Sequence, residues 1–161
     1  KYPDDILEKE VKRATHVLGL TSERLFLLNY KIRYFSNRRQ DILEDMVKIN
    51  KEIRPDLVFL PSTNDTHQDH QIVTNEGVRA FKKTSILGYE LPWNNFTFSN
   101  HCFVNLDENY INKKIEALKC YNSQKDRDYL NEDFIRGLAI TRGTQIGVKY
   151  AEAFEVIRLI L

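Results

Sequence analysis

The sequence has little of several features that mark particular classes of protein. Its two cysteines, Cys102 and Cys120, are too few for a disulfide framework or a cysteine zinc site, and we expect a reducing, cytoplasmic setting. No apolar run approaches the roughly 18 residues of a membrane span. Lys and Arg number 24 against 23 Asp and Glu, a net charge of +1, which gives no electrostatic case for a nucleic-acid partner. A signal peptide has a basic segment followed by an apolar one. The first residues here, Lys-Tyr-Pro-Asp-Asp, do not show this pattern.

What remains has the composition of a globular protein. The 161 residues are 42% hydrophobic and 29% charged, which suits one folded domain over residues 1–161 with a core of its own. We find no internal repeat and no linker between domains.

Apolar periodicity predicts helices that alternate with short strands. Leu7, Val11, Ala14 and Leu18 recur at helical spacing. The other predicted helices are near 42–53, 70–83, 111–118 and 132–149, and the predicted strands are 24–30, 57–60, 85–91, 101–106 and 151–161. This alternation indicates an α/β fold, a Rossmann-like and mainly parallel sheet flanked by helices.

One polar loop is the best candidate for chemistry, because ligands in open α/β sheets bind beyond the carboxyl ends of strands. It follows the strand 57–60 and contains His67 and His70, with Asp65 and Asp69 beside them. Imidazole binds zinc, and a nearby carboxylate fixes the tautomer of the ring. The alternative is a polar surface turn whose Asp and Thr residues cap the next helix.

The remaining histidines do not complete a metal site. His16 lies on the flank of the first helix, and His101 begins a predicted strand. A catalytic zinc usually has about three protein ligands and one open position, so the loop alone supplies too few.

The loop nevertheless resembles a known signature. Residues 65–70 read Asp-Thr-His-Gln-Asp-His, similar to the Asp-x-His-x-Asp-His signature of the PIG-L/LmbE-like deacetylases. These are zinc enzymes that remove the acetyl group from N-acetylglucosaminyl compounds. Further segments resemble the family in the same order along the chain, namely 53–60, 89–93, 114–124, 142–147 and 150–154.

The resemblance implies roles for four loop residues. It makes His70 a zinc ligand and His67 the group that, when protonated, stabilises the oxyanion and helps expel the amine. Asp69 would orient His67, and Asp65 would lie at the mouth of the site. The implied reaction is attack of a zinc-activated water on the acetamide carbonyl of a small N-acetyl amino sugar.

Other residues have weaker functional interpretations. Tyr89 and Trp93 suit a sugar-stacking wall, with ordinary packing as the alternative. Arg142 and Gln145 suit contacts to a sugar or phosphate, with a helix-surface role as the alternative. Glu152 would support the site from behind, or be a solvated strand residue.

The sequence departs from the family at its start. The family opens with a strand and His-Pro-Asp-Asp-Glu, which supplies zinc ligands and the general base, whereas residues 2–5 read Tyr-Pro-Asp-Asp with no strand before them. The single methionine is Met46. We therefore expect an LmbE-like domain that lacks its first strand and most of its metal site. An unpaired strand edge would favour association into a homo-oligomer.

Two other functions remain open at this stage. A non-catalytic module would keep the fold without a complete metal site. A metallophosphoesterase would use the same loop, although such two-metal sites usually need more carboxylates than Asp65 and Asp69.

Overall fold

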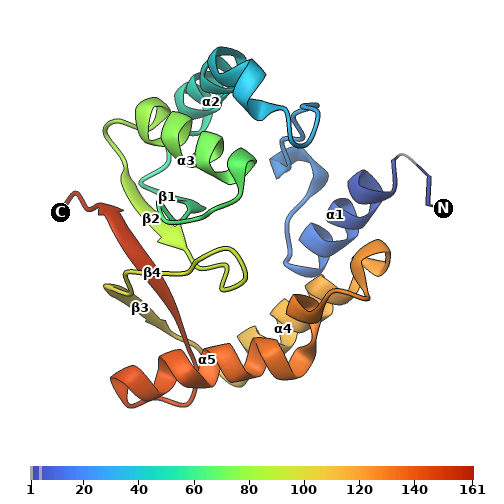
Figure 1. The fold of residues 1–161 in the computed structure, drawn as a ribbon, viewed down its shortest axis with the longest axis vertical. Coiled ribbons are helices and arrows are strands. Elements are labelled where there is room, and N and C mark those ends of the chain that lie inside the picture. The colour runs from blue at the N-terminus through green and yellow to red at the C-terminus, as the bar shows by residue number, and fades with distance from the viewer. Residues whose placement is uncertain (1, 4) are drawn as a thin grey trace. The chain divides into compact units, whose positions relative to one another are not determined.

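The computed structural model describes residues 2, 3 and 5–161 (Figure 1). Asp4, part of the segment compared above with the start of the family, lies outside the described residues. The chain forms two compact units, one made of Lys1–Leu28 with Val104–Glu152 and the other of Asn29–Phe103 with Ala153–Leu161.

The described part of the chain contains both α-helices and strands, interspersed along the sequence. The helices are α1 (Ile6–Val17), α2 (Arg39–Ile53), α3 (Gln68–Ala80), α4 (Glu108–Lys119) and α5 (Glu132–Ile146). The strands are β1 (Leu57–Pro61), β2 (Ser85–Tyr89), β3 (Cys102–Asn105) and β4 (Ala151–Arg158). Short 3-10 turns lie at Ser22–Arg24, Phe35–Arg38, Asn122–Gln124 and Asp128–Leu130.

The sheet has the order β1-β2-β4-β3, which makes β1 an edge strand. Strands β1 and β2 are parallel, with Leu57 opposite Ser85 and Pro61 opposite Tyr89. Strand β4 runs antiparallel to β2. The α/β fold is confirmed, and the antiparallel strand is a detail that periodicity alone does not reveal.

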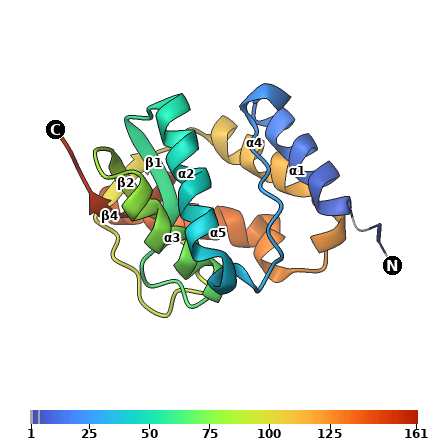
Figure 2. The ribbon, with the colours of Figure 1, turned by 90° about the horizontal axis from the view of Figure 1, so that it is seen from above.

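In the second unit, α2 and α3 pack together against one face of β1 and β2 (Figure 2). Their core consists of Leu43, Leu60, Ala80, Phe81 and Ile86. The buried carboxylate of Glu76 on α3 is paired with Arg39 of α2 and Arg79 of α3. These contacts fix the helix that begins directly after the polar loop.

The first unit is built from α1, α4 and α5. Its apolar core lies between α4 and α5 and contains Ile111, Ile115, Ile135, Ala139 and Tyr150. The buried carboxylate of Glu10 on α1 accepts hydrogen bonds from the main-chain N–H (2.8 Å) and the hydroxyl of Ser123. The serine of the family-like segment 114–124 therefore has a structural role.

The predicted strand at 24–30 is wrong. Residues 22–24 form a 3-10 turn and 25–30 have no regular structure, and Phe26, Leu27 and Leu28 are exposed. The other predicted elements are present with shifted ends, because their caps set the boundaries. Helix α3 begins at Gln68 with His67 as its cap, and α5 ends before Gly147, whose φ is 75°.

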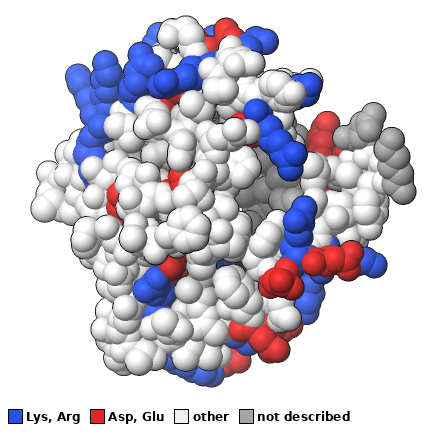
Figure 3. Space-filling view, viewed as in Figure 1, with Lys and Arg blue, Asp and Glu red and all other residues white. Residues whose placement is uncertain are grey.

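Charged side chains are unevenly distributed on the face drawn in Figure 3. Lys and Arg gather there over the α2 and α3 end of the second unit, and much of the remaining surface is uncharged. Among the residues that the structure describes, no helix is long and apolar enough to cross a membrane. Cys102 and Cys120 are free thiols.

Candidate functional site

The polar loop lies where the sequence predicts it, between the carboxyl end of β1 and the start of α3. Thr74 of α3 donates its hydroxyl to the carbonyl of Pro61 at 2.8 Å, and Gln71 donates to the carbonyl of Asp65 at 3.0 Å. The first two turns of the helix therefore hold the loop that precedes it. The loop occupies the position that ligands prefer in open α/β sheets.

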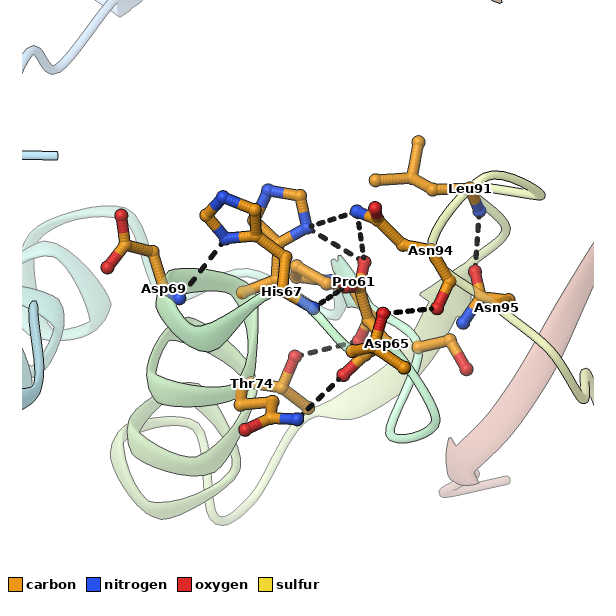
Figure 4. A network of polar contacts seen from close by, with 12 residues as sticks. Pro61, Asp65, His67, Asp69, Thr74, Leu91, Asn94 and Asn95 are labelled. Carbon is orange, nitrogen blue, oxygen red and sulfur yellow. Dashed lines mark hydrogen bonds and ion pairs between the residues drawn. The ribbon is translucent and has the colours of Figure 1, made fainter. Parts of the chain in front are cut away.

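Asp65 and His70 form the central pair of the loop (Figure 4). Oδ2 of Asp65 lies 2.7 Å from Nδ1 of His70. Asp65 is 1% exposed, whereas the side chain of His70 is 31% exposed. The predicted place of Asp65 at the mouth of the site is wrong, because its carboxylate is buried behind the histidine that it contacts.

The contacts of Asp65 determine the tautomer of His70. Oδ1 of Asp65 accepts the main-chain N–H of His67 at 2.7 Å, so the carboxylate acts as an acceptor. In a neutral His70 ring, Nδ1 then carries the hydrogen that it donates to Oδ2, and Nε2 keeps a free lone pair. A carboxylate on the far nitrogen is the arrangement in which histidines bind metal ions.

His67 has the opposite tautomer. It is the N-cap of α3, and its Nδ1 accepts the main-chain N–H of Asp69 at 3.2 Å. A neutral ring with this contact carries its hydrogen on Nε2. The rings of His67 and His70 lie 4.4 Å apart, tilted by 30°. One ring thus offers a lone pair from Nε2, and its neighbour offers a hydrogen.

Asp69, the residue that the resemblance implies would orient His67, contacts that ring through its main-chain N–H, and its carboxylate has other partners. The carboxylate accepts the main-chain N–H groups of Arg33 at 2.5 Å and Phe35 at 3.4 Å. Gln68 donates to the carbonyl of Arg33 at 3.2 Å. Asp69 and Gln68 therefore hold a turn in which Arg33 has a φ of 71°, and it is the main chain of Asp69 that contacts His67.

Glu155 of β4 holds the first residues of the loop. Its carboxylate accepts hydrogen bonds from the hydroxyl of Ser62 and the main-chain N–H of Thr63, each at 2.8 Å, and from the hydroxyl of Thr63. The opposite residue on β2 is Gly88, where a Cβ would lie 3.1 Å from both Oε2 of Glu155 and Cα of Ser62. Sequence reasoning missed Glu155, because its partners lie more than 90 residues away.

The turn formed by residues 91–95 also contacts the polar loop. The carbonyl of Asn94 accepts the main-chain N–H (3.1 Å) and the hydroxyl (2.9 Å) of Thr66. Nδ2 of Asn94 lies 3.4 Å from both Oδ2 of Asp65 and Nδ1 of His70. Sequence reasoning missed Asn94, although it directly follows the family-like segment that ends at Trp93.

Tyr89 lies beside the loop, and Trp93 is exposed on the neighbouring turn. The carbonyl of Tyr89 accepts the main-chain N–H of Ser62 at 3.1 Å. Burial, with a smaller contribution from the charge of Asp65, raises the pKa of Tyr89 to about 12. The phenol therefore stays uncharged at neutral pH. The stacking role of both aromatic residues stays a prediction.

The other predicted substrate residues belong to the first unit. Arg142 and Gln145 lie on α5, where the guanidinium donates to Oε1 of Gln145 at 3.0 Å. Glu152 is paired with Lys114 at 2.6 Å. Gly143 of the same family-like segment has a structural role, because a Cβ there would lie 2.6 Å from the carbonyl oxygen of Val148. Roles of Arg142, Gln145 and Glu152 toward a substrate stay predictions.

The loop supplies one side chain that fits the role of a zinc ligand, that of His70. Nε2 of His70 has the free lone pair and the supported ring that a metal ligand needs. Within residues 2, 3 and 5–161, however, no three His, Cys, Asp or Glu side chains are grouped so that they could hold a metal ion. The donor set of the described residues is therefore partial.

Comparison with known proteins supports the resemblance to the PIG-L family. The family model described as PIG-L, GlcNAc-PI de-N-acetylase, matches residues 4–81. These residues are just under half of the 161-residue chain, and over them the chain resembles the PIG-L family. The match covers α1, α2, β1 and α3 with the His67–His70 loop. It confirms the resemblance that the sequence predicted.

Solved structures share the fold of this chain at low identity. N,N'-diacetylchitobiose deacetylase from Pyrococcus horikoshii is 22% identical with a TM-score of 0.70, over 94% of this chain and 63% of that one. Teicoplanin deacetylase in a zinc-inhibited form is 15% identical with a TM-score of 0.69, over 92% of this chain and 72% of that one.

A third structure with this fold is a hydratase rather than a deacetylase. GalB, the 4-carboxy-2-hydroxymuconate hydratase from Pseudomonas putida, is 17% identical with a TM-score of 0.69, over 98% of this chain and 73% of that one. The match to the chitobiose deacetylase covers 63% of that protein, so the present chain spans less than two thirds of its length. These likenesses establish the fold, and the reaction has to be argued from the site.

Proposed function

We propose that this protein is a zinc-dependent hydrolase that removes the acetyl group from an N-acetylglucosamine-type amino sugar or its conjugate. The observation that carries the proposal is the buried Asp65 behind His70, at 2.7 Å, within the part of the chain that matches the de-N-acetylase family. Deacetylases among the structures with the same fold support the reaction class.

His70 is the residue that would hold the metal, through Nε2. Zinc, when bound, acts as a Lewis acid on an acyl oxygen and makes water more acidic. Asp65 fixes the ring and raises the basicity of the free nitrogen. The described residues contain no group of three metal ligands, so His70 is the one ligand that we propose from them.

His67 would serve the acyl oxygen of the substrate. Its Nδ1 is engaged by the N–H of Asp69, so the hydrogen on Nε2 is available for donation. Hydrogen-bond donors aimed at a developing oxyanion are among the strongest contributors to acyl-transfer catalysis, worth roughly 2.7–4 kcal/mol each. In this geometry His67 donates without first gaining a second proton.

The proposed substrate class is supported by the resemblance to the family and by two neighbouring aromatic residues. Tyr89 and Trp93 offer apolar faces for a sugar ring, and Arg142 and Gln145 offer polar contacts to a hydroxyl or phosphate group. Glu152, which is paired with Lys114, would support the substrate contacts of the first unit.

The test is acetate release from an N-acetylglucosaminide by the purified protein supplied with zinc. The wild type and a His16→Ala control, altered on α1, are expected to release acetate at the same rate. His70→Ala is expected to lose both the bound zinc and the activity. Retention of both by His70→Ala would overturn the proposal.

One alternative rests on a specific observation. The described residues hold no group of three metal ligands, which would suit a non-catalytic module that keeps the fold. Zinc analysis separates the two functions. Stoichiometric zinc that His70→Ala abolishes favours the enzyme, whereas absence of zinc from the purified wild-type protein favours the module.

A further inference from the structure

The turn at 91–95 is closed by its own hydrogen bonds. The main-chain N–H groups of Asn94 and Asn95 donate to the carbonyl of Leu91 at 2.8 and 3.0 Å. The N–H of Leu91 in return donates to Oδ1 of Asn95 at 2.8 Å. These hydrogen bonds lie within the turn, so its shape does not depend on its contacts with the histidine loop.

The same turn is joined to the histidine loop through the main chain of Asn94. Its carbonyl oxygen accepts two hydrogen bonds from Thr66, the residue between Asp65 and His67. Figure 4 shows the side chain of Asn94 pointing toward Asp65, and its Nδ2 also lies 3.4 Å from Nδ1 of His70. Position and direction of this side chain are therefore set by main-chain contacts that a substitution at residue 94 would leave in place.

The amide of Asn94 completes a triangle of polar atoms. Its Nδ2 lies 3.4 Å from Oδ2 of Asp65 and 3.4 Å from Nδ1 of His70, while those two atoms are 2.7 Å apart. Nδ1 of His70 has no lone pair left once it donates to Asp65. The amide hydrogen of Asn94 is therefore directed to Oδ2 of Asp65, at the long end of hydrogen-bond distances.

Three donors then surround the buried carboxylate of Asp65. They are the N–H of His67, Nδ1–H of His70 and Nδ2–H of Asn94. A carboxylate accepting from three directions cannot rotate without losing a bond, and an unmade bond at a buried charged group costs more than at a neutral one. The plane of this carboxylate sets the direction of the His70 ring.

We propose that Asn94 is a positioning residue, which holds Asp65 in the plane where it keeps the hydrogen of His70 on Nδ1 and leaves Nε2 free. Asn94 touches neither the substrate nor the metal in this role. The inference deepens the proposed function. Its expectation for zinc affinity rests on that function, whereas its expectation for the tautomer of His70 does not. The tautomer of His70 can be measured on the chain without metal or substrate.

The experiment records long-range 1H–15N spectra of His70 at neutral pH in the wild type, Asn94→Ala and Asn94→Leu. Leucine has the branched four-heavy-atom skeleton of asparagine, is larger, and removes the donor, so it keeps the turn filled if alanine loosens it. Asn50→Ala is the matched control, because Nδ2 of Asn50 donates to the carbonyl of Ala80 at 2.9 Å in the same unit.

The wild type and Asn50→Ala are expected to hold His70 as the Nδ1–H tautomer. In Asn94→Ala and Asn94→Leu the Nε2–H tautomer becomes populated. Zinc affinity is expected to fall by up to roughly 10–100-fold, the loss that typically follows mutation of a residue that supports a metal ligand. Variants with the wild-type tautomer and the wild-type zinc affinity would overturn the inference, as would a wild type without the Nδ1–H form.

The two proposals fail separately. A tautomer shift in the Asn94 variants without any zinc binding by the wild type would leave the positioning role intact and contradict the zinc enzyme. Zinc binding that depends on His70 and is indifferent to Asn94 would support the enzyme and overturn the positioning role.

Discussion

Oδ2 of Asp65 and Nδ1 of His70 lie 2.7 Å apart, and the carboxylate is buried while the ring reaches solvent. The buried partner fixes the near nitrogen, and the exposed side of the ring carries the free lone pair. A metal ligand has to combine these two properties. Removal of Asp65 should therefore weaken metal binding without removing the ligand itself.

Asp65→Asn is the substitution that isolates this effect. The amide keeps the size of the side chain and removes the charge that stabilises Nδ1–H of His70. Zinc affinity, measured by competition with a chromophoric chelator, is expected to fall roughly 10–100-fold. Asp126→Asn, at an exposed position, is the control and is expected to bind zinc as the wild type does. Equal affinity in both variants would contradict the role of Asp65.

Alkaline titration should show the burial of Tyr89. Its pKa is raised to about 12, chiefly by burial, so the folded protein holds the proton more tightly than the unfolded chain does. The contribution of Tyr89 to stability is full below the ordinary pKa of 10.0 and is lost as the pH rises toward about 12.

The measurement is tyrosinate absorbance near 295 nm for the wild type minus Tyr89→Phe. The difference is expected to follow a single group with a pKa of about 12. Tyr30 also has a pKa of about 12, through burial and then its hydrogen bond to Asp45, so Tyr30→Phe is the matched comparison. A difference curve centred near 10 for Tyr89 would show that the phenol is not buried.

The β1 edge of the sheet should promote self-association. In the described part of the chain β1 pairs with β2 alone, and Leu57, its first residue, is 43% exposed. An unpaired apolar edge is a template for another strand, and lysine on an edge opposes such pairing. Leu57→Lys is expected to lower the sedimentation-average mass of the chain toward that of the monomer.

Phe96→Lys is the control for general stickiness. Phe96 is 91% exposed and lies outside the strands, so its replacement should leave association through β1 unchanged. A monomeric wild type, or association relieved by Phe96→Lys and not by Leu57→Lys, would contradict the role of the edge.

Two glycines of α5 should respond to alanine in opposite directions. A Cβ at Gly143 would lie 2.6 Å from the carbonyl oxygen of Val148, whereas a Cβ at Gly137 would meet nothing within 4 Å. Gly143→Ala is expected to destabilise the fold by about 1–3 kcal/mol through overpacking. Gly137→Ala is expected to stabilise it by about 0.5–1 kcal/mol through helix propensity. Urea unfolding measures both, and stabilisation by Gly143→Ala would refute the close contact.

Much of the fold was predictable because it depends on local patterns. The spacing of Leu7, Val11 and Ala14 predicts α1, and short apolar runs before Pro61 and after Thr84 predict β1 and β2. The segment 24–30 misled because a strand requires a partner, and an apolar run does not reveal whether one is adjacent. Phe26, Leu27 and Leu28 are exposed without such a partner.

The candidate site was predictable in composition and not in detail. The pattern at 65–70 identifies the two histidines, because all residues of the pattern lie within one loop and one helical turn. Support from Asn94 and Glu155 comes across 29 and 93 residues, distances at which a sequence pattern carries no signal. The partners of the Asp69 carboxylate were missed for the same reason, because they include the main-chain N–H of Arg33, 36 residues earlier.

The most direct measurement follows both ring nitrogens of His70 by 15N spectroscopy while zinc is added to the protein. The account predicts that Nε2 takes the chemical shift of a metal-bound nitrogen, while Nδ1 keeps its hydrogen and its bond to Asp65. Zinc bound through Nδ1, or bound with both nitrogens of His70 unchanged, would contradict it.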